Sequence, residues 1–366
     1  MKLKKITYIL IFIILIMNTV NIPVKAQDIY INARCAVALD SKTKMVLFEK
    51  DAHMLVPMAS TTKIMTALVA MKYGDLDKKI EISGKAASIR GSTVGYKKGD
   101  MVTLKELLYG LMLRSGNDAA IAISEGIAGS VEGFVKLMNE YASQIGVYNT
   151  HFESPHGLDS DMHYSTAYDL AMITAKAREN KLFNDIVQTR DIDANQLGFS
   201  RGFHNINKIL WQLPNATGVK TGYTGDAGKC LVSSVSIQGN DVIIVVLNSN
   251  DRWNQTKKIN DYVDKNYKYE KYFSKGDIVA EAPTTNNKQN VKLAVEDDMV
   301  IPVKNGKSYE TKINKPTNIA APVSKGAKLG SIDIYDEGNK IYSSCLQADN
   351  AVEKSNIIKR WFFFKR

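Results

Sequence analysis

The hydrophobic pattern of this chain alternates between strand-like and helical stretches, and their order restricts the folds that it can adopt. Residues 35–48 contain two short apolar runs of the strand type, and residues 60–175 contain several stretches with apolar residues at helical spacing. Two strand-like runs return at 231–247, and a helical stretch follows at 256–267. This order predicts an α+β fold in which helices pack on an antiparallel sheet.

Local signals place the turns between these stretches. The polar residues 40–44 and 238–241 each separate two strand-like runs, which predicts two hairpins. The apolar stretch Leu104–Leu113 predicts a helix that breaks at residues 114–117, and the next helix is expected to begin at Asp118.

The last part of the chain lacks helical periodicity. Short strand-like runs separated by polar turns extend from residue 291 to residue 346. They predict a small all-β domain of about seventy residues, which is close to the size at which a hydrophobic core is stable alone. We therefore expect one domain over residues 27–274 and an all-β domain over residues 275–348.

The amino-terminal segment has the composition of a secretory signal peptide. Three lysines accompany a largely apolar run, residues 6–17, which is too short to span a bilayer. Val24 and Ala26 place small residues at the −3 and −1 positions of a cleavage site. We expect residues 1–26 to be removed and the protein to be exported, with an uncleaved membrane anchor as the alternative.

The carboxyl-terminal segment, residues 349–366, mixes aromatic and cationic side chains near its end. Trp361 and the three phenylalanines that follow it are flanked by lysine and arginine, and the apolar part is too short to cross a membrane. Such a composition suits the lipid–water interface. We expect a tail that lies on a membrane surface, and a disordered or self-docked tail is the alternative.

Charge and cysteine content exclude some classes of partner. The formal net charge is +10 at pH 7, which is compatible with anionic lipid or an anionic polymer. The lysines are scattered and no nucleic-acid motif occurs, so no nucleic-acid partner is expected. Cys35, Cys230 and Cys345 lie far apart, which predicts buried thiols rather than a disulfide framework or a metal site. No cofactor is expected.

Ser60 and Lys63 form the first of three short motifs that together suggest a nucleophilic site. They lie three residues apart at the start of a predicted helix, so their side chains share one face within a single turn. A hydroxyl needs a nearby base to act at neutral pH, and a desolvated lysine near other cations favours its neutral form. Alone the pair is weak evidence, and Thr62 and Thr66 would then be plain helix surface.

The second motif, Ser115-Gly116-Asn117, lies at the break between two predicted helices. In a functional interpretation, Ser115 relays a proton between Lys63 and a leaving group, and Asn117 holds a substrate amide. In a structural interpretation the motif is a helix cap, because serine and asparagine are preferred capping residues. In isolation the cap is the stronger explanation.

The third motif, Lys220-Thr221-Gly222, begins a predicted edge strand. Lys220 would supply positive potential, and Thr221 would bind a substrate carboxylate. Gly222 would leave room for an extended peptide to approach the strand. Alone, the three residues mark only the start of a strand.

Taken together and in this order, the three motifs resemble those of the low-molecular-mass penicillin-binding proteins, the serine-type D-alanyl-D-alanine carboxypeptidase family. The similarity extends to the segments Pro57–Ala67, Pro155–Asp159 and Gly218–Thr224, and it continues through the β domain and the cationic tail. The resemblance implies a β-lactamase/transpeptidase-like domain followed by the all-β domain.

The resemblance also implies a mechanism. Ser60 would attack the carbonyl between the two D-alanines of a peptidoglycan pentapeptide and form an acyl-enzyme, and β-lactams would acylate the same serine. Lys63 would act as the base, and Ser115 with Lys220 would pass a proton to the departing D-alanine. The protein would work at the outer face of the cytoplasmic membrane or in the cell wall.

Substrate contacts are implied in the same way. The backbone amides of Ser60 and Tyr223 would form the oxyanion hole. Asn117, Thr221 and Gly222 would contact the peptide. Arg252 would bind the terminal carboxylate together with Thr221, and a solvated surface arginine is the alternative at that position.

Three other functions are compatible with parts of the sequence. A β-lactamase shares the serine and both lysines, but class A members add a glutamate in a Glu-x-x-Leu-Asn setting, which this sequence lacks. A Ser-His-Asp hydrolase would use Ser200 within residues 198–202, but a polar segment precedes it and only His204 follows it. A wall-binding module without activity would need no nucleophile.

Overall fold

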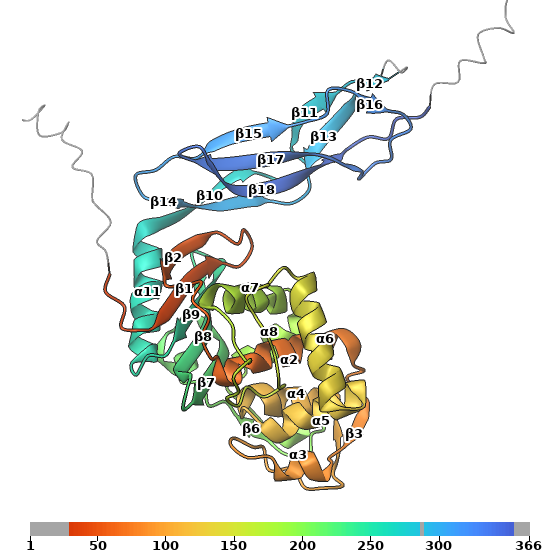
Figure 1. Ribbon diagram of the computed structural model, residues 1–366. Helices are drawn as coiled ribbons and strands as arrows, with labels where there is room; N and C mark the ends of the chain where they lie inside the picture. Colours follow the sequence, from red (N-terminus) through yellow and green to blue (C-terminus); the bar gives the residue numbers. More distant parts are fainter. Residues whose placement is uncertain (1–28, 286–288, 355–366) are drawn as a thin grey trace, which may run out of the picture.

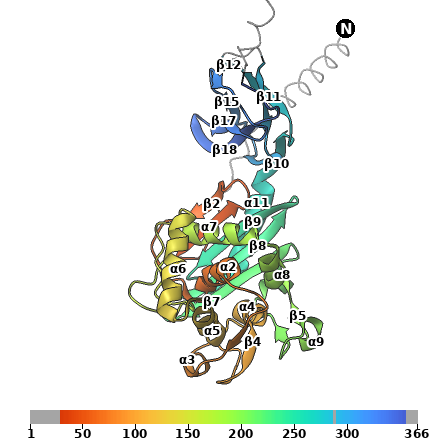
Figure 2. The same ribbon diagram turned by 90° about the vertical axis from the view of Figure 1, so that its right-hand side faces the viewer.

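The computed structural model describes residues 29–285 and 289–354, which form two domains (Figure 1, Figure 2). The first domain combines a five-stranded sheet with helices, and the second is built from strands. The helix α11 (Arg252–Asn266) leads from the first domain into the second. The fold is therefore α+β followed by an all-β domain, as the order of the sequence patterns predicts.

The sheet of the first domain is antiparallel and has the strand order β2-β1-β9-β8-β7. Its central strand is buried along residues 242–247, because apolar side chains pack against both faces. The motif that begins at Lys220 lies on β7, which is an edge strand as predicted. The five strands are β1 (Cys35–Asp40), β2 (Val46–Lys50), β7 (Ala216–Thr224), β8 (Gly228–Ile237) and β9 (Asn240–Leu247).

Both predicted hairpins form. β1 pairs with β2, and β8 pairs with β9 through a tight turn at Gln238 and Gly239. These two residues have φ of 50° and 79°. Positive φ at both central positions matches the twist of the flanking strands, and glycine adopts it without steric cost.

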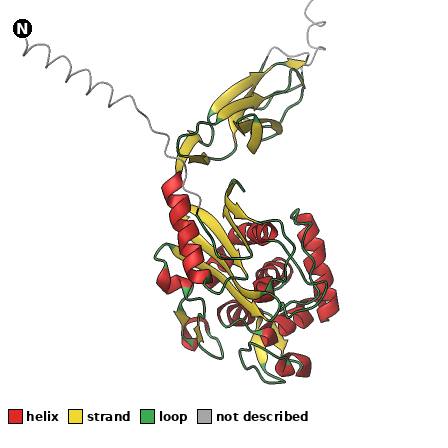
Figure 3. Ribbon diagram, turned by 60° about the vertical axis from the view of Figure 1, so that its left-hand side comes forward, coloured by secondary structure: helices red, strands yellow, loops and turns green. Residues whose placement is uncertain are grey.

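Helices cover both faces of the sheet (Figure 3). α7 packs on β1 and β9, and α11 packs on β8 and β9 from the other side. α4 begins and ends where the sequence predicts, and α5 begins one residue earlier than expected, at Asn117. The other helices and short strands of this domain are α2 (Lys63–Tyr73), α3 (Gly84–Ser88), α4 (Leu104–Leu113), α5 (Asn117–Ala128), α6 (Val131–Gln144), α7 (Ala167–Arg178), α8 (Lys181–Gln188), α9 (Ala194–Leu197), α10 (Ile209–Gln212), β3 (Lys79–Glu81), β4 (Met101–Thr103), β5 (Asp191–Ile192) and β6 (Phe203–His204).

The second domain contains a five-stranded sheet with the order β11-β13-β18-β17-β15 and two smaller strand pairs, β10–β14 and β12–β16. Tyr269 on β10 donates a hydrogen bond to Asp40 Oδ2 (2.7 Å), which joins the second domain to the turn of the first hairpin. The strands are β10 (Tyr267–Phe273), β11 (Ile278–Ala282), β12 (Thr284–Thr285), β13 (Val291–Val295), β14 (Met299–Lys304), β15 (Glu310–Asn314), β16 (Ile319–Ala320), β17 (Lys328–Asp336) and β18 (Asn339–Ala348).

The cysteine prediction holds for two residues and is wrong for the third. Cys35 and Cys230 are buried free thiols in the first domain. Cys345 is an exposed free thiol on β18, because the alternation of a strand that is covered on one face turns it toward solvent.

Two predictions about the ends of the chain fall outside the described residues. They are the signal peptide, residues 1–26, and residues 355–366 of the tail. Within residues 29–285 and 289–354, no helix has the length and apolar composition needed to cross a membrane.

Candidate active site

The predicted nucleophile lies in a strained turn that precedes α2. Ala59 has a φ of 50°, a left-handed value that is uncommon for a residue with a side chain, and Ser60 follows it in the 3-10 helix η1 (Ala59–Thr62). Thr62 Oγ1 donates a hydrogen bond to Ala59 O (2.8 Å), which closes the turn. The helix predicted from Ser60 therefore starts as a 3-10 turn and becomes α-helical at Lys63.

The side chain of Lys63 reaches back to the serine. Its Nζ lies 3.0 Å from Ser60 Oγ, 2.8 Å from Asn117 Oδ1 and 2.7 Å from the carbonyl oxygen of His156. The amide and carbonyl oxygens are acceptors only, so they take two N–H groups of the amine. A neutral amine then directs its lone pair at Ser60 Oγ, which is the geometry that a general base requires.

The electrostatics of the site favour that neutral amine. Lys63 is fully buried, and burial together with the neighbouring Lys220 ammonium holds the pKa of Lys63 well below its usual range. Lys220 is 1% exposed, and burial followed by the charge of Arg252 lowers the pKa of Lys220 to about 7. Burial thus lowers the pKa of both lysines, and in each case the charge of a neighbouring cation adds to the effect.

The Ser115–Asn117 motif does not cap a helix, so that interpretation is wrong. Gly116 occupies the N-cap position of α5 without a side-chain cap bond. Asn117 instead accepts from Lys63 and donates through Nδ2 to Arg90 O (2.7 Å). Ser115 is 3% exposed and has a left-handed φ of 61°.

Asp118 anchors a loop against this motif, a role that the sequence reasoning missed. Its carboxylate accepts hydrogen bonds from the backbone N–H groups of Val94 (2.9 Å), Gly95 (2.8 Å) and Tyr96 (3.2 Å). The backbone N–H of Asn117 donates to Ser92 O (2.8 Å). The only sequence signal for this contact is an acidic residue in the first turn of a helix.

β7 runs beside the turn formed by Ala59–Thr62, which we call the nucleophile turn. Lys220 Nζ donates to Thr221 O (2.9 Å), and the Tyr223 side chain is 68% exposed. A Cβ atom on Gly222 would lie 3.1 Å from Ser60 N. Glycine at this position therefore allows the strand to contact the nucleophile turn, which is a second reason for its presence besides the approach of a peptide.

Arg252 is not a solvated surface residue, so that alternative is wrong. Its Nη1 donates to the carbonyl oxygens of Gly222 (2.7 Å) and Cys230 (2.9 Å), which lie on β7 and β8. The guanidinium also lies 4.8 Å from the centroid of the Trp253 ring. The structure places the Arg252 guanidinium beside Gly222, the last residue of the third motif. A contact between Arg252 and a substrate carboxylate stays a prediction.

His163 supports the nucleophile turn through a directed chain of hydrogen bonds. Glu153 N donates to His163 Nδ1 (3.0 Å), so the ring carries its proton on Nε2 and donates it to Thr62 Oγ1 (2.8 Å). Burial lowers the pKa of His163 to about 4, which keeps the ring neutral at neutral pH. Thr62 in turn donates to Ala59 O, so His163 stabilises the turn through Thr62.

The loop that begins at Pro155 packs against the same turn. Thr66 Oγ1 donates to Pro155 O (2.6 Å), and a Cβ atom on Gly157 would lie 1.9 Å from Ala59 O. Thr62 and Thr66 are both fully buried, so the suggestion that they are helix surface is wrong. Only the resemblance to a known family connected residues 155–159 with Ser60, because nearly a hundred residues separate them.

Ser200 does not form a hydrolase site. Its Oγ and backbone N both donate to the Glu106 carboxylate, and the segment before it is the helix α9 rather than a strand. His204 pairs with Asp191 instead (Nδ1 to Oδ1, 2.6 Å). In the described part of the chain, no group of three or more His, Cys, Asp or Glu side chains is arranged to hold a metal ion.

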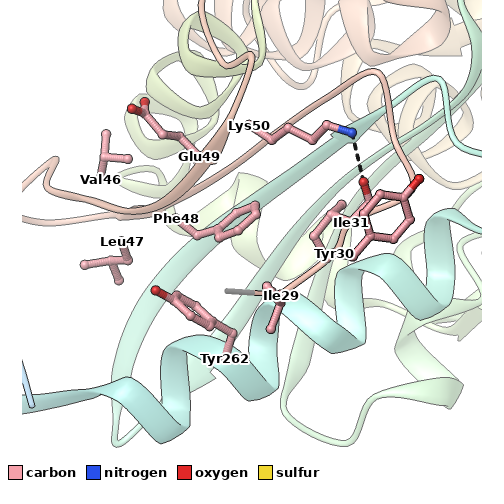
Figure 4. A pocket seen from close by; sticks show the side chains of 9 residues that line it. All are labelled: Ile29, Tyr30, Ile31, Val46, Leu47, Phe48, Glu49, Lys50 and Tyr262. Atoms are coloured by element: carbon pink, nitrogen blue, oxygen red, sulfur yellow. Dashed lines mark hydrogen bonds between the residues drawn. The ribbon is translucent and has the colours of Figure 1, made fainter. Parts of the chain in front are cut away.

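A cavity of about 570 Å³ lies at β2, the sheet edge opposite β7 (Figure 4). Residues 29–31, residues 46–50 and Tyr262 line it, and Lys50 Nζ donates to Ile31 O (2.9 Å) across one end. None of the predicted site residues lines this cavity. The candidate active site is therefore the group around Ser60 at the opposite side of the sheet.

Two family models cover most of the chain. Residues 21–251 match the family described as D-alanyl-D-alanine carboxypeptidase, and residues 267–354 match the C-terminal domain of penicillin-binding protein 5. The chain is 32% identical over 356 residues to the D-alanyl-D-alanine carboxypeptidase DacF of Bacillus subtilis, with 93% of this chain and 90% of that protein covered. It is 30% identical to DacA of Escherichia coli, with 85% and 81% covered.

Solved structures give the same result. Penicillin-binding protein 5 from Haemophilus influenzae superposes with a TM-score of 0.77 at 29% identity, covering 90% of this chain and 100% of that one. The Streptomyces K15 DD-transpeptidase superposes with a TM-score of 0.60 at 34% identity, covering 64% and 98%. Because the first family model spans more than half of its length, the chain belongs to the D-alanyl-D-alanine carboxypeptidase family of low-molecular-mass penicillin-binding proteins.

Proposed function

We propose that Ser60 is the nucleophile of this D-alanyl-D-alanine carboxypeptidase and that Lys63 is the base that activates it. The observation that carries the proposal is the 3.0 Å contact between Lys63 Nζ and Ser60 Oγ, made by a fully buried lysine. The enzyme removes the terminal D-alanine from peptidoglycan stem peptides and is inhibited by β-lactams, which in this scheme acylate Ser60.

Acylation begins when Ser60 Oγ attacks the carbonyl carbon between the two D-alanines and its proton passes to Lys63. The tetrahedral oxyanion receives hydrogen bonds from the backbone N–H groups of Ser60 and Tyr223. The C–N bond then breaks, the amine of the leaving D-alanine takes a proton, and an ester to Ser60 remains. Water attacks that ester with Lys63 again as the base, which releases the shortened peptide.

The second and third motifs complete this scheme. Ser115 is buried and relays the proton from Lys63 to the leaving amine, with the charge of the Lys220 ammonium favouring the transfer. Thr221 and Arg252 bind the terminal carboxylate. Both ends of the Asn117 amide already have protein partners, so we assign it chiefly to holding Lys63 and expect any substrate contact to share its Nδ2 group.

Exchanging Ser60 for alanine tests the assignment. We expect the Ser60→Ala protein to gain no mass after incubation with penicillin and to release no D-alanine from diacetyl-lysyl-D-alanyl-D-alanine. Ser200→Ala is the matched control, because Ser200 only bonds Glu106, and it should become acylated and hydrolyse the peptide. A penicilloyl adduct on the Ser60→Ala protein would refute the proposal.

The pH dependence of kcat/KM follows from the two lysines. Activity should rise as Lys63 loses its proton, and it should fall as the pH passes about 7, where Lys220 loses the charge that this scheme requires. A bound carboxylate favours the Lys220 ammonium, so the falling limb of kcat should lie at higher pH than that of kcat/KM.

The Lys220→Arg protein checks the assignment of that limb. A guanidinium stays charged over the whole range, so the variant should be less active but should lack the falling limb. A falling limb that persists unchanged in Lys220→Arg would assign the titration to another group.

We further propose that the enzyme is exported and attached to the outer face of the cytoplasmic membrane by its tail. The lysine-led apolar segment before Gln27 and the aromatic, cationic residues 356–366 support this location. Co-sedimentation with anionic vesicles of the chain with and without residues 349–366 tests it, and equal binding by both would refute the attachment.

A further inference from the structure

An exposed tryptophan lies on α10, which precedes β7 in the chain, and it is not among the residues proposed for catalysis. The Trp211 side chain on α10 is 45% exposed, and Ile206 beside it is 37% exposed. Residues 204–206, Lys208, Trp211 and Gln212 line a hollow of about 390 Å³, which we call the Trp211 platform. A hollow that an aromatic ring and several polar side chains line together has the composition of a ligand site.

The ring of Trp211 is held rigidly in this position. The His204 ring lies 5.4 Å from it between centroids, at an interplanar angle of 32°, and the Arg190 guanidinium lies 5.7 Å from its centroid. His204 is itself bonded to Asp191, and Arg190 Nη2 donates to Leu210 O. A ring fixed in this way loses little conformational entropy when it binds a ligand.

The Trp211 platform adjoins α4, which precedes the second motif, and β7, which carries the third. Ile206 N donates to Leu113 O (3.1 Å), and Leu113 lies at the end of α4, just before Ser115. α10 also packs on β7, which carries Lys220. The platform is therefore linked to the helix that precedes the second motif and to the strand that carries the third.

The chemistry of the platform suits carbohydrate. The C–H groups on one face of a sugar ring pack against the face of an aromatic ring, whose quadrupole is negative there. His204, Lys208 and Gln212 also line the hollow, and their polar groups can bond hydroxyl and acetamido groups. Peptidoglycan presents such groups, because its stem peptides are attached to strands of N-acetylated amino sugars.

We propose that the Trp211 platform binds the amino-sugar rings of a wall glycan strand and so retains the polymer while its stem peptides are cleaved. The inference rests on the function proposed above, because it assumes that the peptide enters at Ser60. It adds a polymer-binding site that soluble peptide substrates do not use.

Trp211→Ala separates the two kinds of substrate. Release of D-alanine from insoluble peptidoglycan, at concentrations below saturation, should fall about tenfold, which corresponds to the loss of one aromatic contact. Release from diacetyl-lysyl-D-alanyl-D-alanine should not change. Tyr148→Ala is the matched control, because Tyr148 is a 79% exposed aromatic residue that does not line the hollow, and it should alter neither rate. Trp211→Phe, which retains an aromatic face, should restore most of the activity on the polymer.

Binding to glycan strands from which the stem peptides have been removed tests the site without catalysis. The Ser60→Ala protein should bind these strands as the wild type does, and adding Trp211→Ala should weaken binding about tenfold. Equal binding with and without Trp211, or an equal loss of activity on both substrates, would overturn the proposal. Loss of vesicle binding or of self-association in Trp211→Ala, with glycan binding unchanged, would overturn it as well.

The two proposals fail in distinguishable ways. If the wild type released no D-alanine from either substrate, the function proposed for Ser60 would be contradicted. Glycan binding by the Ser60→Ala protein would still decide the role of the Trp211 platform, because that measurement needs no turnover.

Discussion

A Lys63→Met protein should be acylated by penicillin about a hundredfold to ten-thousandfold more slowly than the wild type, because the substitution removes the proposed general base. Methionine is unbranched and of similar length, so it fills the space without a buried charge. Asn117 Oδ1 and His156 O lose their donor, which should lower the free energy of unfolding by about 1–3 kcal/mol. Intact-protein mass spectrometry over time measures the acylation rate.

Lys72→Met is the control for this experiment. Lys72 lies on the same helix, where its Nζ donates to Gln144 and lies 3.9 Å from the centroid of the Tyr141 ring. Its replacement should leave the acylation rate unchanged. Acylation of Lys63→Met at the wild-type rate would show that another group takes the proton from Ser60.

Gly157→Ala should destabilise the protein by about 2–5 kcal/mol, the sum of a left-handed backbone penalty and the strain of overpacking. The residue has a φ of 83°, and the added Cβ would lie 1.9 Å from Ala59 O and 2.6 Å from Thr62 Oγ1. The nucleophile turn or the loop must move to accept it, so penicillin acylation should also slow. Urea unfolding and the acylation rate measure the two effects.

Gly146→Ala isolates the backbone part of this effect. Gly146 has a similar φ of 78°, and an added Cβ would meet no atom within 4 Å. The control should therefore cost only about 1–2 kcal/mol and leave acylation unchanged. Equal destabilisation by the two substitutions would contradict the close contact between Gly157 and the nucleophile turn.

The elements that the sequence predicts well are those with local causes. The hairpin between β8 and β9 follows from a two-residue turn, and α4 follows from apolar spacing and a break after Leu113. The pairing of Ser60 with Lys63 is also local, because a three-residue separation at a helix start brings the side chains together. α5 shows the ordinary error, a start displaced by one residue.

The alternatives that the structure excludes concern residues whose role depends on distant partners. Asn117 fits the composition of a helix cap, yet its amide bonds Lys63, which lies on another helix. Thr62 and Thr66 are compatible with a helix surface, yet both are buried against residues 155–163. Arg252 fits an exposed helix start, yet its guanidinium bonds two strands of the sheet.

The sequence by itself determined the order of helices and strands and the spacing of Ser60 and Lys63, because each depends on neighbours within a few residues. Only the tertiary structure decided which oxygens surround Lys63, why Gly157 must lack a side chain and how His163 holds the nucleophile turn. Those contacts join segments separated by 54 to 101 residues, and burial among them lowers the pKa of Lys63.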